Sequence, residues 1–271
     1  MGSQGEGKNP GTLSTQRAAR HRVFVGPAER YDAAAHLQFN LLTLLGLREN
    51  HTLLDIGCGS LRAGRLFITY LLPGHYFGLE PERWLVEEGI QKELGRDCLA
   101  LKKPEFSYDG NFTLTGFGRE FDFLLAHSIF SHAPPAQIRR CLEQARQCMK
   151  PDSLFAATFL EGEENYTGTD FVQPGSVTYQ LAWMQETAAA GLACTPIEWF
   201  HPNQSWVLLA RSENQARVAE LTTLNDIVSR PGRTHTRELK SLRQAWLRRH
   251  RFALWGLRLD RLLKRIRRRL G

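Results

Sequence analysis

Between Thr52 and about Leu160, the chain alternates between two patterns of apolar positions. Short apolar runs, typical of buried strands, are followed by stretches with the spacing of an amphipathic helix. We expect strands at 52–56, 75–79, 106–108, 121–126 and 154–160, and helices at 60–72, 81–94 and 135–149. Strands that alternate with helices in this way predict a parallel sheet with helices on both faces.

The pattern changes towards the end of this region. A helix is expected at 179–190, and it is followed by two strands, 193–199 and 205–210, with only a short turn between them. Strands joined by so short a link pair antiparallel, because a parallel crossover needs a dozen or more residues. With a further helix at 31–47, the pattern predicts a doubly wound, seven-stranded, mostly parallel α/β sheet of the Rossmann-like kind that ends in an antiparallel hairpin.

Candidate binding chemistry begins at the end of the first expected strand, in the run Asp-Ile-Gly-Cys-Gly at 55–59. In an open α/β sheet, ligands bind beyond the carboxyl ends of the strands. Gly57 and Gly59 permit a tight turn and a close approach of the ligand to the backbone. A helix that begins next would offer free N–H groups to a carboxylate, and Asp55 would attract an ammonium group.

A second acidic residue follows at the end of the next strand. Glu80 lies 25 residues after Asp55, where a carboxylate can accept hydrogen bonds from both hydroxyls of a ribose. A dinucleotide fingerprint would place a third glycine at position 62, but Arg62 stands there and the next glycine is Gly64. The loop therefore favours S-adenosylmethionine (SAM) over NAD. An NAD(P)-dependent reductase is kept as an alternative, although no Tyr-x-x-x-Lys pair is present.

The run from Leu53 to Gly64 resembles motif I of the class I SAM-dependent methyltransferases. More narrowly, the blocks at 55–64, 70–81 and 121–132 resemble bacterial methyltransferases that carry DIGCGSLR-G, Y-L--G-Y-G-EP and FD---A-SIF-H. The resemblance covers about 31–211 and implies methyl transfer from SAM. It implies cofactor contacts at the methionine-binding loop (Asp55, Gly57, Cys58, Gly59), the ribose (Glu80, Pro81), the adenine (Asp109, with Asn111 as an alternative) and the sulfonium (Ala126, His127, Ser128).

Two histidines near the fourth strand are candidates for catalysis. An alcohol acceptor needs a group that takes its proton, commonly a histidine. His127 lies at the exit of the strand, and the alternative is a polar wall that faces the cofactor. His132 precedes Ala-Pro-Pro at 133–135, and its alternative is a structural role in that turn. Glu161 and His201 are further candidates. Metal-dependent methyltransferases need a set of Asp and Asn ligands that is not recognisable here, so we predict no metal.

Charge divides the chain into segments. The net charge of +7 hides a tail, 236–271, with thirteen Lys and Arg against two acidic residues, which leaves the other residues with a charge of −4. We expect a flexible segment at 1–29, a methyltransferase domain at 30–212 and a helical extension with a basic amphipathic tail at 213–271. The apolar stripe of the tail, with Trp255, is typical of helices that lie in an anionic membrane surface. Binding to nucleic acid, which we favour less, and packing on the domain stay open.

The sequence indicates the cellular location and the methyl acceptor less directly. No apolar run approaches the ~20 residues of a membrane-spanning helix, and the first residues show no apolar signal-peptide core. The expectation is a cytoplasmic protein, peripheral to the inner membrane face. The five cysteines form no Cys-x-x-Cys pair, which is unlike a disulfide framework or a zinc site. The resemblance suggests a sugar hydroxyl of a surface glycan as acceptor. A non-catalytic adaptor, bound to membrane or nucleic acid through the tail, is the remaining alternative, and the oligomeric state is open.

Overall fold

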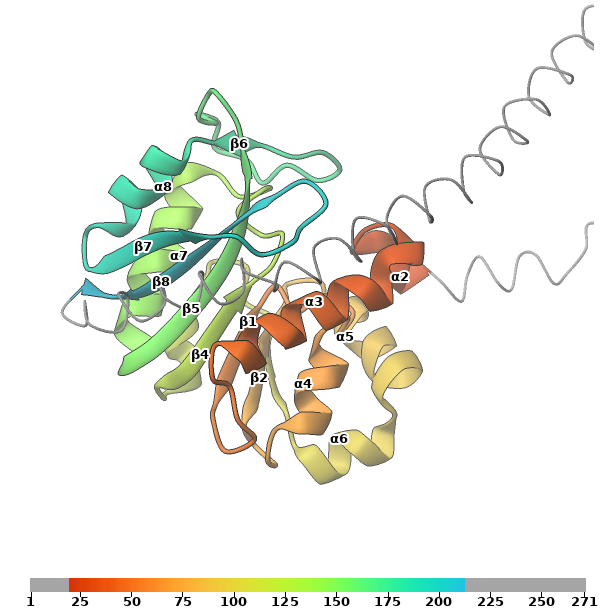
Figure 1. The fold of residues 1–271 in the computed structure, drawn as a ribbon. Coiled ribbons are helices and arrows are strands. Elements are labelled where there is room, and N and C mark those ends of the chain that lie inside the picture. Colours follow the sequence, from red (N-terminus) through yellow and green to blue (C-terminus); the bar gives the residue numbers. More distant parts are fainter. Residues whose placement is uncertain (1–19, 213–271) are drawn as a thin grey trace, which may run out of the picture. The chain divides into compact units, whose positions relative to one another are not determined.

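The computed structural model describes residues 20–212. The expectations for 1–19 and for 213–271, including the basic tail at 236–271, lie outside the described residues. Seven strands lie side by side in the order β3-β2-β1-β4-β5-β8-β7, and an eighth, β6, pairs with β5 (Figure 1). Their bounds are β1 Leu53–Ile56, β2 Tyr76–Leu79, β3 Glu105–Ser107, β4 Phe121–Ala126, β5 Met149–Glu161, β6 Thr178–Tyr179, β7 Leu192–Ile197 and β8 Ser205–Arg211.

The pairing confirms the predicted topology. β1 pairs in parallel with both β2 and β4, and β4 pairs in parallel with β5. β8 runs antiparallel to both β5 and β7, so the expected terminal hairpin is present. The short β6 is an addition that the apolar pattern did not reveal; it pairs in parallel with the end of β5. The five parallel strands β1 to β5 therefore end at the same edge of the sheet. The loop at 55–59, here called the cofactor loop, lies at this edge.

Helices cover both faces of the sheet. The α-helices are α2 Arg20–Phe24, α3 Tyr31–Leu44, α4 Gly64–Tyr70, α5 Arg83–Gly89, α6 Arg96–Lys102, α7 Pro135–Cys148 and α8 Leu181–Ala188. Two 3-10 segments, η1 Ala28–Arg30 and η3 Leu114–Phe117, and a π-helical segment, η2 Ile90–Leu94, complete the set.

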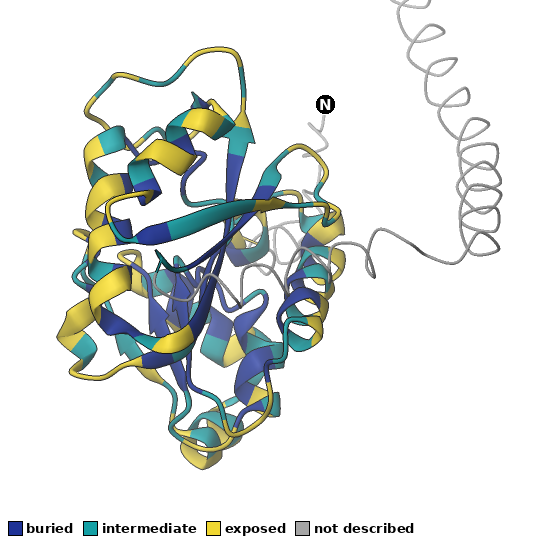
Figure 2. Ribbon diagram, turned by 60° about the vertical axis from the view of Figure 1, so that its left-hand side comes forward, coloured by how far each residue is buried: buried dark blue, intermediate teal, exposed yellow. Residues whose placement is uncertain are grey.

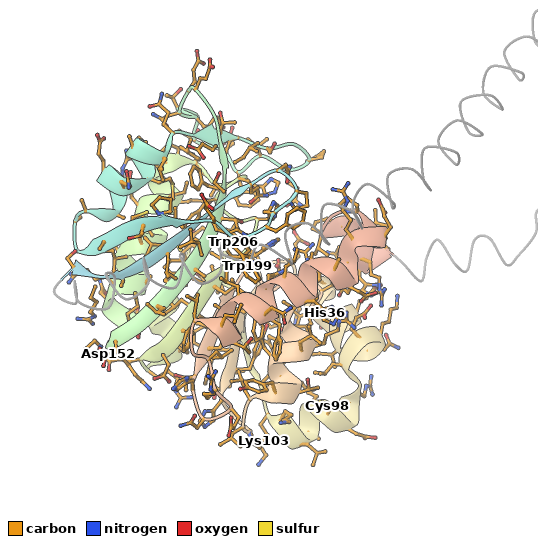
Figure 3. The ribbon with its side chains drawn as sticks, viewed as in Figure 1. His36, Cys98, Lys103, Asp152, Trp199 and Trp206 are labelled. Carbon is orange, nitrogen blue, oxygen red and sulfur yellow. The ribbon has the colours of Figure 1, made fainter. Side chains whose placement is uncertain are left out.

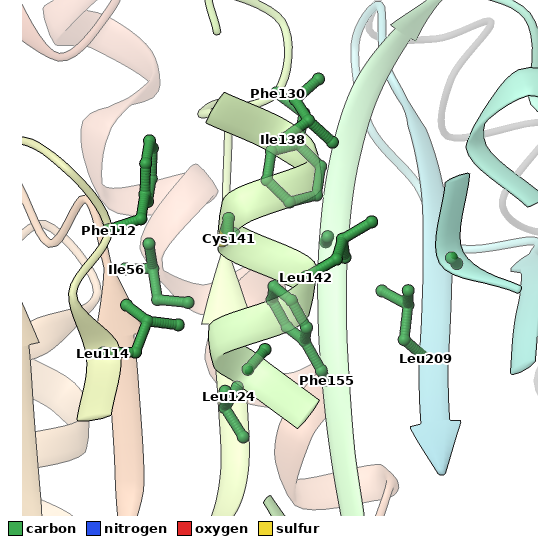
Figure 4. Close-up of a cluster of buried hydrophobic side chains, with 14 of the residues drawn as sticks. Ile56, Phe112, Leu114, Leu124, Phe130, Ile138, Cys141, Leu142, Phe155 and Leu209 are labelled. Atoms are coloured by element: carbon green, nitrogen blue, oxygen red, sulfur yellow. The ribbon is translucent and has the colours of Figure 1, made fainter. Parts of the chain in front are cut away.

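The sheet separates two hydrophobic clusters, and the central strands β1, β2 and β4 between them are almost entirely buried, whereas the edge strands β3 and β7 are not (Figure 2). One cluster lies under α7 and α8, where Ile138, Cys141 and Leu142 of α7 face Phe155 of β5 and Leu209 of β8 (Figure 4). The other lies under α3 and α4. Burial on both sides explains why the central strands read as continuous apolar runs rather than as alternating ones.

The start of α4 differs from the predicted span. We expected a helix directly after Gly59, but α4 begins only at Gly64, and turns occupy the residues between. Leu61 takes a φ of 59°, which interrupts any helix there. The hydroxyl of Tyr31 donates to the carbonyl of Ser60 at 2.9 Å and ties these turns to α3. The expected row of free helical N–H groups is therefore not next to Gly59, and this prediction was wrong.

The segment that precedes α3 folds back towards the cofactor loop. His21 and Arg22 both bind the carboxylate of Glu93 in η2, each with a contact of 2.6 Å. The following turn brings Val25 beside Gly59. The first described residues therefore pack against the binding edge of the sheet.

Candidate active site

The cofactor loop depends on its two glycines. Gly57 and Gly59 have φ values of +72° and +54°, a region that favours glycine. A Cβ on Gly57 would lie 2.0 Å from Cδ1 of Ile129, and one on Gly59 would lie 2.8 Å from Cγ1 of Val25. The N–H of Gly57 donates to the carbonyl of Leu79 at 2.7 Å, which holds the loop against β2. Both the backbone conformation and the close neighbours therefore require glycine.

Asp55 is a buried carboxylate at the end of β1. Its Oδ2 accepts a 2.7 Å hydrogen bond from the hydroxyl of Tyr76. Burial raises the pKa of Asp55 to about 7, although the bond from Tyr76 and the charge of Arg62 act in the opposite direction. A carboxyl group that is half ionised near neutrality would gain from a neighbouring ammonium group, because an opposite charge favours its ionised form.

Glu80 lies where the ribose ligand is expected. Its two carboxylate oxygens accept hydrogen bonds from the N–H groups of Gly59 and Glu82, both at 2.9 Å. Burial raises the pKa of Glu80, and these two N–H groups partly offset that effect. A carboxylate has about four lone-pair sites, so two remain for hydroxyl donors. Its position directly links the cofactor loop to the end of β2.

Asp109 follows β3 and organises the next loop. Its Oδ2 accepts hydrogen bonds from the N–H groups of Asn111 at 3.0 Å and Thr113 at 2.7 Å. Partial burial opposes ionisation, but the two N–H groups hold the pKa of Asp109 below its usual value. With six other residues, Asp109 lines a cavity of about 460 Å³ between β3 and η3. Pro81 borders the same loop, 3.8 Å from where a Cβ on Gly110 would lie.

His127, at the exit of β4, is held as a hydrogen-bond donor. Nη2 of Arg62 lies 3.0 Å from Nδ1 of His127. A guanidinium only donates, so Nδ1 accepts and the proton of the neutral ring resides on Nε2. Burial and the charge of Arg62, with a smaller contribution from His201, lower the pKa of His127 well below its usual value. His127 is therefore neutral near pH 7 and presents an N–H group.

His201, in the turn between β7 and β8, has the same tautomer. Its Nδ1 accepts from the N–H group of Gln204 at 2.9 Å, so Nε2 carries the proton. Burial and the charge of Arg62 lower its pKa to about 4. The rings of His201 and His127 are 5.0 Å apart, and Trp206 contacts both. Figure 3 shows Trp206 between the strands and α3.

Ser128 fixes the chain as it leaves β4. It has a φ of 61°, and its N–H group donates to Oγ1 of Thr158 at 2.7 Å. Its hydroxyl accepts a 3.0 Å bond from the side chain of Gln204. The exit of β4 is thereby tied to β5 and to the β7–β8 turn. Within residues 20–212, Oε1 of Gln204 and Nε1 of Trp206 are buried without a hydrogen-bond partner.

His132 is held in the opposite tautomer to His127. Its Nδ1 lies 3.0 Å from the carbonyl oxygen of Val172. A carbonyl only accepts, so Nδ1 carries the proton and Nε2 presents its lone pair. The backbone of Val172 returns a 2.9 Å bond to the carbonyl of His132, and Phe171 stacks on the ring. A neutral histidine in this arrangement can accept a proton.

The chain also matches a known protein family. Residues 54–155 match the family model described as a methyltransferase domain. Residues 54–155 therefore carry a methyltransferase domain. The predicted fold and the predicted enzyme class, a methyltransferase, are confirmed. The match identifies no acceptor.

Solved structures share the fold of this methyltransferase at low identity. A structure of the DhpI–SAH complex has a TM-score of 0.53 and 18% identity, over 73% of this chain and 94% of that one. Magnesium protoporphyrin IX methyltransferase from Synechocystis PCC 6803 with bound SAH gives 0.52 and 13%, over 74% and 95%. The PH0226 protein from Pyrococcus horikoshii OT3 gives 0.53 and 12%, over 72% and 96%. At such identities the likeness supports the fold alone.

The methyltransferase fold gathers most of the residues that we singled out. The cofactor loop, Glu80 and the β4 exit share one edge of the sheet, with the buried Ala126 as the last residue of β4. Cys58 is buried in the loop, and burial raises the pKa of its thiol, so it is a packing residue there. Asp109 lies beyond β3.

Sequence reasoning missed three neighbours of this edge: Val25, Arg62 and Ile129. In the sequence, Arg62 is notable only because it stands where a dinucleotide fingerprint has a glycine. Its contact with His127 joins positions 65 residues apart in the chain, so no local pattern could reveal it.

Two further findings concern the same part of the chain. Residues 20–212 contain no group of three His, Cys, Asp or Glu side chains placed to hold a metal ion. In that range, no helix is both long enough and apolar enough to cross a membrane.

Proposed function

We propose that this methyltransferase binds SAM with the methionine end at Asp55–Gly59, the ribose at Glu80 and the adenine towards Asp109. Three features of the chain support this arrangement: the glycine loop, the free acceptor sites of Glu80 and the near-neutral pKa of Asp55. When bound, SAM supplies an electrophilic methyl group on a sulfonium. The residues of the chain then have to orient the acceptor, exclude water and take up a proton.

We further propose a hydroxyl acceptor with His132 as the general base, and the tautomer of His132 is the observation that carries this. As the hydroxyl oxygen bonds to the methyl carbon, the carbon–sulfur bond breaks and the hydroxyl proton moves to Nε2 of His132. The carbonyl of Val172, 3.0 Å from Nδ1, would stabilise the resulting imidazolium. His127 presents an N–H group instead, so we assign it to the polar wall of the site.

The class of acceptor and the cellular position stay proposals. A sugar hydroxyl of a surface glycan, which the sequence resemblance suggests, fits a general base such as His132. A peripheral membrane position through residues 236–271 fits a membrane-associated acceptor. Co-sedimentation with vesicles would test the latter, using the full chain and a variant with the Lys and Arg of 258–269 changed to Gln. Equal binding of both forms to anionic vesicles would contradict the membrane proposal.

Calorimetry tests the cofactor assignment directly. We expect wild type to bind SAM and S-adenosylhomocysteine (SAH) and not NADH. Gly57→Val should lose at least about 100-fold in affinity, because its side chain meets Ile129 and its φ is strained. Gly74→Val is the matched control, since Gly74 has a φ of +74° with nothing within 4 Å of its Cβ position. Failure of wild type to bind SAM, or preferential binding of NADH, would overturn the proposal.

A further inference from the structure

Arg62 is a partly buried cation that lacks a carboxylate partner among residues 20–212. Its Nη1 donates to the carbonyl of Val25 at 2.7 Å, and its Nη2 donates to His127. Both of these partners are neutral. Two arginines nearby differ in this respect, because Arg65 pairs with Asp32 and Arg22 pairs with Glu93. Arg62 therefore stands out within its own surroundings.

An unpaired cation at such a site is costly. The hydrogen bonds to Val25 and His127 replace only part of the hydration that a partly buried charge without a counter-ion loses. Burial lowers the pKa of Arg62, and the ionised forms of Tyr31 and Asp55 act in the opposite direction. Asp55 compensates only in part, since it is engaged by Tyr76 and is half protonated near pH 7. A guanidinium has five N–H groups, and the two bonds to Val25 and His127 leave three for a ligand.

Arg62 also begins a row of donors. His127 follows it at the β4 exit, and His201 follows His127 in the β7–β8 turn. Each ring accepts at Nδ1 and presents N–H at Nε2. One fixed positive charge with two neutral N–H donors matches the needs of an oxyanion, whereas a cationic ligand would be repelled.

We infer that Arg62, His127 and His201 form an oxyanion-binding site beside the cofactor loop, and that its ligand carries a carboxylate or phosphate group. The inference rests in part on the proposed binding of SAM, because the oxyanion has two possible sources. One is the methionine carboxylate of SAM itself. The other is an acidic group on the methyl acceptor. Arg62 is a binding residue in either case.

Calorimetry with two cofactor analogues separates these sources. SAH carries the amino-acid carboxylate, whereas 5′-methylthioadenosine shares its nucleoside and thioether but has no carboxylate. If the carboxylate comes from the cofactor, Arg62→Gln should weaken SAH about 10- to 100-fold, as expected for a charge-assisted hydrogen bond, and leave 5′-methylthioadenosine unchanged. Arg62→Lys should recover part of the loss, because lysine restores the charge without the planar fork. Arg65→Gln is the matched control.

Phosphate tests the second source. The imidazole signals of His127 and His201 are followed by NMR in the SAH-loaded protein as inorganic phosphate is added. If the site faces the acceptor, phosphate should shift both rings and raise their pKa values in wild type, and should do neither in Arg62→Gln. The charged or titrating groups that act on these rings are Arg62 and His201 for His127, and Arg62 for His201.

The outcomes are distinct. Unchanged binding of SAH by Arg62→Gln, together with no response of either histidine to phosphate, would overturn the inference while the proposed function stands. Failure of wild type to bind both SAH and 5′-methylthioadenosine would instead overturn the proposed function.

Discussion

His127 and His132 lie five residues apart after the same strand, yet the fold assigns them opposite hydrogen-bonding roles. The partner of Nδ1 makes the difference. A guanidinium donates to Nδ1 of His127 and leaves an N–H group at Nε2, whereas a carbonyl accepts from Nδ1 of His132 and leaves a lone pair. Identical side chains close in sequence thus become a donor and an acceptor through one contact each.

The surroundings of the two rings differ in charge as well. The His127 side contains Arg62, Asp55 and a second neutral histidine, so it can respond to ionic ligands. The His132 side contains a backbone carbonyl and an aromatic ring. We therefore assign ligand charge to the first side and proton transfer to the second.

The strongest test of this division replaces each histidine in turn. His132→Gln should lower kcat by about 10²- to 10⁴-fold, the usual contribution of a general base, with SAH affinity unchanged. His127→Gln keeps an amide donor and should change kcat far less. Transfer of the tritiated methyl group of SAM to a panel of sugars would measure both. The division fails if His127→Gln abolishes transfer and His132→Gln does not.

The charged side around His127 can be tested by comparing the unfolding free energy of wild type with that of Asp55→Asn at two pH values. The folded protein holds the proton of Asp55 up to about pH 7, whereas the unfolded chain releases it near 3.8. The folded state therefore binds more protons between these values, and the contribution of Asp55 to stability falls as pH rises. Between pH 5 and pH 8, wild type should lose roughly 1–3 kcal/mol of unfolding free energy relative to Asp55→Asn. Urea denaturation at both pH values measures this, and parallel changes in the two proteins would argue against a buried, titrating Asp55.

The affinity for SAH should depend on the ionisation of the same carboxyl group, Asp55. Protonation removes the charge that attracts an ammonium group, so SAH should bind about tenfold more weakly at pH 5.5 than at pH 7.5. Asp55→Asn should show no such slope. His127 and His201 should not contribute, because both stay neutral over this range. Calorimetry at the two pH values checks this, and an equal slope in both proteins would assign the titration elsewhere.

The smallest expected effect lies beside His132. Ser131 is buried, and its hydroxyl has no hydrogen-bond partner among the described residues. Ser131→Ala should change the unfolding free energy by less than about 1 kcal/mol, because it removes no bond. Ser153→Ala is the control: this hydroxyl is equally buried but donates to the carbonyl of Phe121, so its loss should cost about 1–2 kcal/mol. A large loss of methyl transfer in Ser131→Ala would instead place that hydroxyl in the catalytic machinery.

The sequence alone determined the framework of this protein. The bounds of β4 agree with the predicted 121–126, and the antiparallel end of the sheet followed from the short link before β8. The loop at 55–59 and Glu80 were identified because ligands bind at the carboxyl ends of the strands, where glycine allows a close approach and a carboxylate can accept hydrogen bonds. These features depend on spacing along the chain, and spacing is written in the sequence.

Only the tertiary structure decided how the site works. The delayed start of α4 depends on Leu61 and on the bond from Tyr31, and the tautomers of His127 and His132 depend on Arg62 and Val172. The pKa of Asp55 depends on its burial beneath neighbouring elements. Each of these contacts joins residues that lie far apart in the chain. Periodicity carries no information about such partners, because hydrogen bonding and desolvation are set by neighbours in space.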